Sequence, residues 1–213
     1  MRLFVGIPLA DAVERDLEAT VARLRNARSG GLRWTAPDSW HITLEFLGNA
    51  TEAQFECLRA RLAEVRAAAV AVQLGALGCF ERSGVLFTEV QVSPELAALQ
   101  RKVIAATARC GFAAEAREFH PHITIAREQG SRGAREREDR QQGNKGAGKP
   151  GARQPESQGA GMRESGLRAL VARAGAGKAF PRFTAREFLL YESHLEPGGA
   201  RYEVRMRIPL GGE

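Results

Sequence analysis

The sequence carries one short pattern twice: His41-Ile42-Thr43-Leu44 and His122-Ile123-Thr124-Ile125. The chain has 4 histidines among its 213 residues, so a matched pair of this kind needs an explanation. Both copies have the composition of a short β-strand, in which successive side chains point to opposite faces. The histidine and threonine of each copy therefore share one face, and the two aliphatic residues share the other. Each strand is expected to anchor in a core through its aliphatic face and to present a His–Thr pair on the other side.

Two such strands facing one another would bring two imidazoles and two hydroxyls together. One neutral imidazole can take a proton from water while the other, as imidazolium, gives a proton to a leaving oxygen. Hydroxyl groups can stabilise the non-bridging oxygens of a phosphoryl group as charge accumulates on them. The pair thus indicates phosphoryl transfer without a metal. The pattern is symmetric and does not say which histidine is the acid.

Composition places the chain among ordinary globular proteins of one domain or two small ones, with 44% hydrophobic and 26% charged residues. The net charge is +6, and only Lys102, Lys145, Lys149 and Lys178 among the 31 basic residues are lysines. Arginine's planar fork suits phosphate, which favours a nucleic-acid or nucleotide partner, although a GC-rich genome would also enrich arginine. We expect no membrane helix and no signal peptide, because the apolar runs are too short.

Three cysteines stand far apart: Cys57, Cys79 and Cys110. Their odd number and their spacing argue against a secreted disulfide framework and against a zinc site. We expect all three to be reduced, buried side chains in a cytoplasmic protein.

The rest of the chain alternates between strand-like and helix-like periodicity. Expected strands are Arg2–Ile7, Leu32–Trp34, His41–Leu47, Val70–Phe80, Val85–Val92, His122–Arg127, Thr184–Ser193 and Arg201–Ile208. Expected helices are Asp11–Ala27, a helix capped by Thr51 that runs to about Ala69, a helix from Pro94 to about Arg109, and Leu167–Ala174. Hairpins mixed with helices predict an α+β fold with antiparallel or mixed sheets, in preference to a parallel doubly wound sheet.

One segment lacks the side chains needed for a core. Residues 128–166 are rich in glycine and charge, and Met162 is their only large apolar side chain. Such a stretch cannot bury enough surface to offset its ordering entropy. We expect about 130–162 to be a disordered insertion in a single domain spanning 1–213. It is either simply solvated or a basic tract that touches RNA.

These features resemble the two-histidine (2H) phosphoesterases, and within them the RNA 2′,3′-cyclic phosphodiesterases, also called bacterial and archaeal 2′-5′ RNA ligases. The two His-apolar-Thr-apolar copies are the signature of that superfamily. The similarity extends to the opening strand at Met1–Pro8, to the stretch WHITLEFLG at 40–48, to FHPHITIAR at 119–127, and to a closing strand at Leu189–Ser193.

The resemblance implies a bilobal fold of two pseudo-symmetric sheets with outer helices around a central cleft. It also implies hydrolysis of RNA 2′,3′-cyclic phosphate ends to 2′-phosphomonoesters. In the family, the residue matching His41 donates a proton and the one matching His122 accepts one, while Thr43 and Thr124 hold the phosphate. We accordingly expect a cytoplasmic, membrane-free monomer that uses no metal and no cofactor.

Residues near the two motifs carry further expectations. Arg127 matches a family arginine near the phosphate, but its offset of five from His122 requires the strand to end or bulge. Phe46 has the same offset from His41 and is expected in the core, with base stacking as the alternative. Glu45 is expected on the face of His41, where it would either raise the pKa of that imidazole or repel RNA phosphates.

The two remaining histidines are assigned no catalytic role. His120 lacks the spaced partners of a metal site, and His194 is expected at the surface or in a turn.

Three alternative functions remain open. The protein could be a 2′-5′ RNA ligase, a phosphodiesterase for another cyclic nucleotide, or a non-catalytic RNA-binding module.

Overall fold

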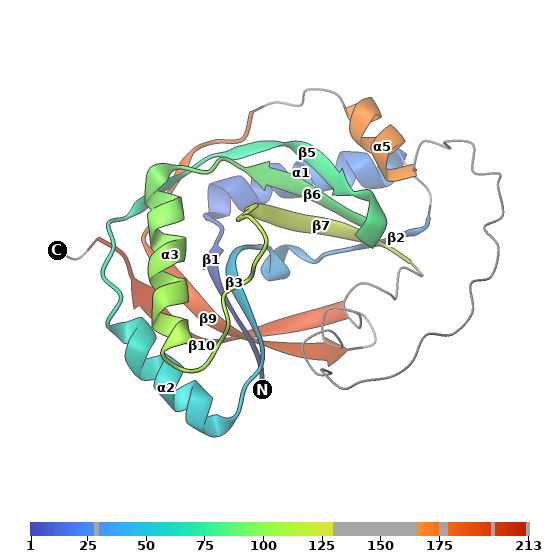
Figure 1. The fold of residues 1–213 in the computed structure, drawn as a ribbon. Helices are drawn as coiled ribbons and strands as arrows, with labels where there is room; N and C mark the ends of the chain where they lie inside the picture. The colour runs from blue at the N-terminus through green and yellow to red at the C-terminus, as the bar shows by residue number, and fades with distance from the viewer. Residues whose placement is uncertain (28–29, 130–165, 175–178, 197–198, 212–213) are drawn as a thin grey trace, which may run out of the picture.

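In the computed structural model, helices stand between single strands and between groups of consecutive strands (Figure 1). The structure describes residues 1–27, 30–129, 166–174, 179–196 and 199–211. The elements are β1 (Arg2–Pro8), α1 (Asp11–Ala27), β2 (Leu32–Trp34), η1 (Pro37–Ser39), β3 (His41–Asn49), α2 (Glu52–Ala63), β4 (Val70–Val72), β5 (Leu74–Phe80), η2 (Glu81–Ser83), β6 (Val85–Val90), α3 (Pro94–Ala108), β7 (His122–Glu128), α5 (Gly166–Ala174), β8 (Phe183–Ala185), β9 (Glu187–Glu196) and β10 (Gly199–Pro209). The expected insertion at 130–162 lies outside the described residues.

The strands form two four-stranded sheets, in the orders β10-β9-β1-β3 and β2-β7-β6-β5, and a small pair, β4-β8. Every strand pair recorded among the described residues is antiparallel, which narrows the expected antiparallel or mixed sheets to antiparallel ones. Helices α2 and α3 lie along one side of the molecule, and α1 and α5 lie together on another (Figure 1). This is the α+β architecture that the sequence predicts.

The two motif strands point their aliphatic residues into one common core. Ile42, Ile123 and Ile125 have no exposed surface, and Leu44 is almost fully buried. Residues of both four-stranded sheets and of helices α1, α2, α3 and α5 belong to this same cluster. The shared core fixes β3 against β7, two strands that belong to different sheets and contact one another.

The N-terminal cap of α2 is where the sequence predicts it, but the end of α2 and the strand after it differ from the prediction. Thr51 forms a capping box with Gln54 at the start of α2, as predicted. The helix ends at Ala63 instead of about Ala69, because the chain turns there and the side chain of Arg66 donates to the Ala63 carbonyl at 2.6 Å. The expected strand Val70–Phe80 is two strands, since β4 leaves the larger sheet to pair with β8.

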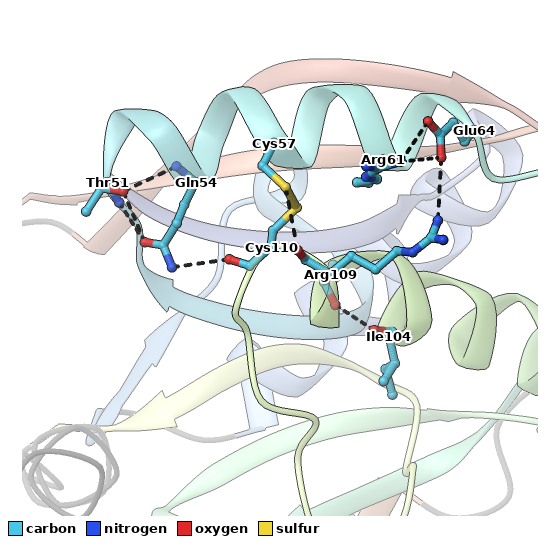
Figure 2. The surroundings of a disulfide bond; sticks show 9 residues. Thr51, Gln54, Cys57, Arg61, Glu64, Ile104, Arg109 and Cys110 are labelled. Atoms are coloured by element: carbon cyan, nitrogen blue, oxygen red, sulfur yellow. Dashed lines mark hydrogen bonds and ion pairs between the residues drawn. A yellow bond between two sulfur atoms is a disulfide. The ribbon is translucent and has the colours of Figure 1, made fainter.

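A disulfide joins Cys57 of α2 to Cys110, just after α3 (Figure 2). Their Cα atoms lie 5.7 Å apart although 53 positions separate them in the sequence. The expectation of three reduced, buried cysteines is wrong for this pair, because only the packing of α2 on α3 reveals that the two side chains meet. Cys79 is free and half-buried. No helix in the described part of the chain is long and apolar enough to cross a membrane.

Candidate active site

Both histidines of the repeated pattern are the first residue of their strand. His41 begins β3 and His122 begins β7, and each side chain is half-buried. The strands β3 and β7 contact one another although they belong to different sheets (Figure 1).

The two imidazoles are held in the same way. Nδ1 of His41 lies 2.9 Å from the carbonyl oxygen of Ser39, and Nδ1 of His122 lies 2.8 Å from that of His120. A carbonyl oxygen can only accept, so Nδ1 carries the hydrogen in both rings. In the neutral form Nε2 then holds the lone pair, and in the charged form Nε2–H is the transferable proton. The carbonyl two residues upstream therefore sets the same tautomer in both motifs.

Aromatic rings surround His41 on the face of its sheet that points away from the main core. The ring centroids of Phe4, Tyr202 and Tyr191 lie 4.6, 5.0 and 5.7 Å from that of His41. Gly6 of β1 lies beneath the ring, where a Cβ atom would sit 3.0 Å from the Ile42 carbonyl oxygen and 3.4 Å from His41 Cδ2. Only a glycine lets the imidazole pack this closely on the backbone.

A second aromatic cluster surrounds His122. The centroids of Phe80 and Phe87 lie 5.1 and 5.2 Å from that of His122. Gly78 admits the Phe87 ring, because a Cβ there would lie 2.6 Å from Phe87 Cζ. Burial in this cluster lowers the pKa of His122, and the charges of His120 and Arg127 lower it further, against the opposing hydrogen bond to the His120 carbonyl. His122 therefore favours its neutral, proton-accepting form.

A break in register occurs at the same place in both motif strands. In β3, Thr43 faces Gly6 and Glu45 faces Val5, so Leu44 has no partner of its own. In β7, Thr124 faces Phe87 and Ala126 faces Leu86, which leaves out Ile125 in the same way. Such bulges place two successive side chains on the same side of a strand. The buried pairs are Leu44 with Glu45 and Ile125 with Ala126.

The bulges decide which side chains accompany the histidines. After the bulge of β7, Arg127 is half-buried on the face of His122. The sequence analysis required a strand end or a bulge for this placement, and the bulge is present. After the bulge of β3, Phe46 is 59% exposed, and its expected place in the core is wrong. Its ring lies 6.1 Å from that of Phe4, which also contacts His41. An arginine on one strand and a phenylalanine on the other thus occupy equivalent positions.

The same bulge overturns the expectation for Glu45. Its side chain turns into the core, away from the face of His41, and is only 6% exposed. There Oε2 accepts a hydrogen bond of 2.8 Å from the Thr107 hydroxyl of α3, while Oε1 has no hydrogen-bond partner among the described residues. Burial raises the pKa of Glu45 to about 7, and the hydrogen bond from Thr107 opposes that rise. Glu45 is therefore a core carboxyl group with no direct coupling to His41.

Thr43 and Thr124 are both half-buried, two residues after their histidines and before the bulges. The two histidines, the two threonines, Arg127 and Phe46 thus lie on the faces of β3 and β7 that point away from the core. Sequence reasoning did not find the aromatic rings around the histidines. The glycines at positions 6 and 78, inside strands, are the signal of close packing that could have indicated them.

Neither of the other histidines joins this group as a metal ligand. His120 is exposed, with its ring 6.2 Å from that of His122. His194 lies within β9, not in a turn, and its Nε2 is 3.3 Å from Glu203 Oε2. Within the described ranges, no three His, Cys, Asp or Glu side chains gather as a metal site would require.

Two antiparallel sheets that each contribute one His-x-Thr strand define the class of two-histidine phosphoesterases. The chain belongs to the 2′-5′ RNA ligase superfamily, whose family model matches residues 13–145. An RNA 2′,3′-cyclic phosphodiesterase of Aeropyrum pernix is 35% identical over 119 residues, which cover 53% of this chain and 68% of the relative. One of Bacillus subtilis is 29% identical over 130 residues, which cover 59% of this chain and 70% of the relative.

Solved structures share the fold over the whole chain. E. coli LigT in its apo form superposes with a TM-score of 0.66 at 22% identity, covering 99% of this chain and 98% of LigT. The protein TT0787 of Thermus thermophilus has a TM-score of 0.66 at 24% identity, and the match covers both chains completely at 100%. These likenesses establish the fold.

Proposed function

We propose that this protein hydrolyses RNA 2′,3′-cyclic phosphate ends to 2′-phosphomonoesters by two-histidine acid–base catalysis. The observation that carries the proposal is the matched pair of imidazoles, each with Nδ1 held by the carbonyl two residues upstream. The name shared by its curated relatives, RNA 2′,3′-cyclic phosphodiesterase, supports the choice of substrate. Both sheets would act as the two lobes of a single domain, with the substrate bound in a cleft between them.

The reaction needs one base and one acid. His122 Nε2 accepts a proton from water as the water oxygen attacks phosphorus. The bond from phosphorus to the 3′ oxygen breaks, and His41 Nε2–H gives its proton to that oxygen. The product keeps the phosphate on the 2′ oxygen, and the two histidines exchange protonation states, which solvent then restores.

The surroundings of His122 support this assignment of roles. Burial against Phe80 and Phe87 lowers its pKa, so it is neutral over more of the physiological pH range than an ordinary histidine. A neutral imidazole is the form that a base requires. The sequence pattern, being symmetric, offers no such distinction.

The threonines and the arginine complete the phosphate site in this proposal. Hydroxyls of Thr43 and Thr124 donate hydrogen bonds to the non-bridging oxygens, on which charge develops in the transition state. Arg127, on the His122 face after the bulge, adds a charged contact to the same phosphate. Phe46, exposed at the equivalent position of β3, offers a stacking surface to the terminal base.

The proposed mechanism uses no metal and no cofactor, because the two imidazoles supply both proton transfers. We further propose that the protein acts as a monomer in the cytoplasm, where RNA ends are processed. Cytoplasmic thiols keep most cysteines reduced. Activity should then tolerate opening of the Cys57–Cys110 bond.

Ligation is a second candidate, favoured by the description of the matching family as 2′-5′ RNA ligases. A 5′ hydroxyl would replace water as the nucleophile, lose its proton to His122, and displace the 3′ oxygen, which His41 protonates. The product is a 2′-5′ phosphodiester. Because the acid and base are the same, an oligonucleotide with a cyclic phosphate end, incubated with and without a 5′-hydroxyl acceptor strand, distinguishes the two reactions.

The histidine variants test the proposal. His41→Ala and His122→Ala should each lower kcat by about 10² to 10⁴, the range for one acid–base group, in buffer containing a chelator. His194→Ala, outside the site, is the matched control and should leave kcat unchanged. Near-normal turnover in either motif variant would remove the mechanism. An unmodified protein that binds RNA but shows no turnover would instead be a binding module.

The pH profile tests the assignment of the base. The acid limb of kcat/KM should lie below about pH 6.5, the value of an unperturbed histidine, because the pKa of His122 is lowered. An acid limb above that value would contradict the assignment of His122 as the base.

A further inference from the structure

A hollow of about 380 Å³ lies between the end of α2 and the outer side of α3, on helices and not on the motif strands. Its apolar lining residues are Val65, Ala105 and Ala106. The charged residues lining it are Arg61, Glu64, Arg66, Lys102 and Arg109. Four cations against one carboxylate leave an excess of three positive charges in this hollow.

Part of this charge has a structural use. Arg66 Nη1 donates to the Ala63 carbonyl at 2.6 Å, and Lys102 Nζ donates to the Arg66 carbonyl at 2.8 Å. These contacts cap carbonyl groups where α2 ends and the chain turns. They account for Arg66 and Lys102, but not for Arg61 and Arg109.

The remaining two arginines share one carboxylate. Arg61 Nη1 lies 3.1 and 3.2 Å from the two oxygens of Glu64, and Arg109 Nη1 lies 3.7 Å from Glu64 Oε2 (Figure 2). Each guanidinium has five N–H donors and uses one nitrogen in these contacts. Glu64 thus orients two guanidinium groups without neutralising both. The remaining N–H donors of the two guanidinium groups suit a phosphate group.

The packing of α2 against α3 brings these two arginines to the same hollow. Cys57 precedes Arg61 by one helical turn, and Cys110 follows Arg109 directly (Figure 2). In the oxidised protein the disulfide adds a covalent link between the two helices beside the hollow. A preformed cationic site loses less conformational entropy on binding than two independent surface arginines would.

We propose that this hollow binds the phosphodiester backbone of RNA, away from the strands that carry His41 and His122. The choice of RNA rests on the proposed function, because an RNA with a reactive end also presents phosphates along the rest of its strand. The site would add affinity for a strand and contribute nothing to a mononucleotide.

The test compares two double variants of equal charge. Arg61→Gln with Arg109→Gln removes the two cations that share Glu64. Arg59→Gln with Arg23→Gln removes two exposed arginines that lie outside the hollow. The probe is a fluorescent 12-nucleotide RNA with an ordinary 3′ hydroxyl, and binding is measured by anisotropy at several salt concentrations. Thermal unfolding confirms that both proteins are folded.

Losing two phosphate contacts should weaken RNA binding about tenfold at low salt and reduce the slope of log Kd against log salt by about 1.4, at about 0.7 per contact. The control pair should keep the slope of the unmodified protein. Turnover of a cyclic mononucleotide should be unchanged in both. Equal losses in the two double variants, or an unchanged slope in the hollow variant, would overturn the proposal.

The last measurement tests whether inorganic phosphate competes with the 12-nucleotide RNA for the hollow. If phosphate binds the hollow tightly without displacing the 12-nucleotide RNA, the site serves a free anion and the assignment to RNA is wrong. RNA binding here does not depend on hydrolysis. Loss of the proposed activity and loss of this site are therefore separate outcomes.

Discussion

Glu45 gives the most direct test of how the bulge in β3 arranges the site. Its carboxyl group lies in the core, where burial raises its pKa from an ordinary 4.5 to about 7. In the folded protein it stays protonated between these values, whereas in the unfolded chain it has already ionised. The unfolded state then binds fewer protons, so the free energy of unfolding falls as the pH rises.

The size of this effect follows from the shift. The contribution is fully present below about pH 4.5 and is lost as the pH rises to about 7. At 1.36 kcal/mol per pKa unit, the loss is about 3 kcal/mol. Glutamine has nearly the same shape, keeps an oxygen for the Thr107 hydroxyl and never ionises. Glu45→Gln should therefore match the unmodified protein near pH 4.5 and exceed its stability by about 3 kcal/mol at pH 8.

Urea unfolding of the oxidised protein at pH 4.5, 6 and 8 measures this difference. Glu56→Gln, which removes an exposed carboxylate of α2, is the matched control for the change in charge. Thr107→Val should raise the pKa of Glu45 further, because the hydrogen bond that lowers it is lost. A Glu45→Gln difference that stays constant from pH 4.5 to 8 would refute the buried, protonated carboxyl group.

Three further perturbations test the site and its frame. Gly6→Ala should displace the ring of His41 and lower kcat about tenfold or more with little change in KM, because the new Cβ would meet Ile42 O at 3.0 Å; unchanged kcat would contradict this packing. Phe46→Ala should leave the thermal midpoint nearly unchanged, because the side chain is exposed. It should raise KM for an oligonucleotide about 5- to 100-fold, the range for one lost base stack. A large loss of stability would instead indicate that Phe46 belongs to the core. Reduction of the disulfide should lower the unfolding free energy by up to about 4 kcal/mol for a closed loop of this length without lowering kcat on a cyclic mononucleotide, as parallel unfolding and activity measurements would show.

The sequence by itself determined the strands that carry the site. The alternation of apolar and polar residues in the two motifs predicts both strands and the burial of Ile42 and Ile123, because side chains of a strand alternate between faces. The periodicity of Asp11–Ala27 likewise predicts α1 with its correct bounds. Local patterns of this kind depend only on backbone geometry, which every chain shares.

Tertiary structure decided what lies beside the histidines. A bulge is set by pairing with another strand, so nothing local places Glu45 in the core, Phe46 in solvent and Arg127 on the face of His122. The disulfide also depends on tertiary packing, because Cys57 and Cys110 meet only when α2 packs against α3. The symmetry of the two motifs is broken in a similar way. The motifs do not encode the different aromatic neighbours of the two imidazoles, nor the burial that lowers the pKa of His122.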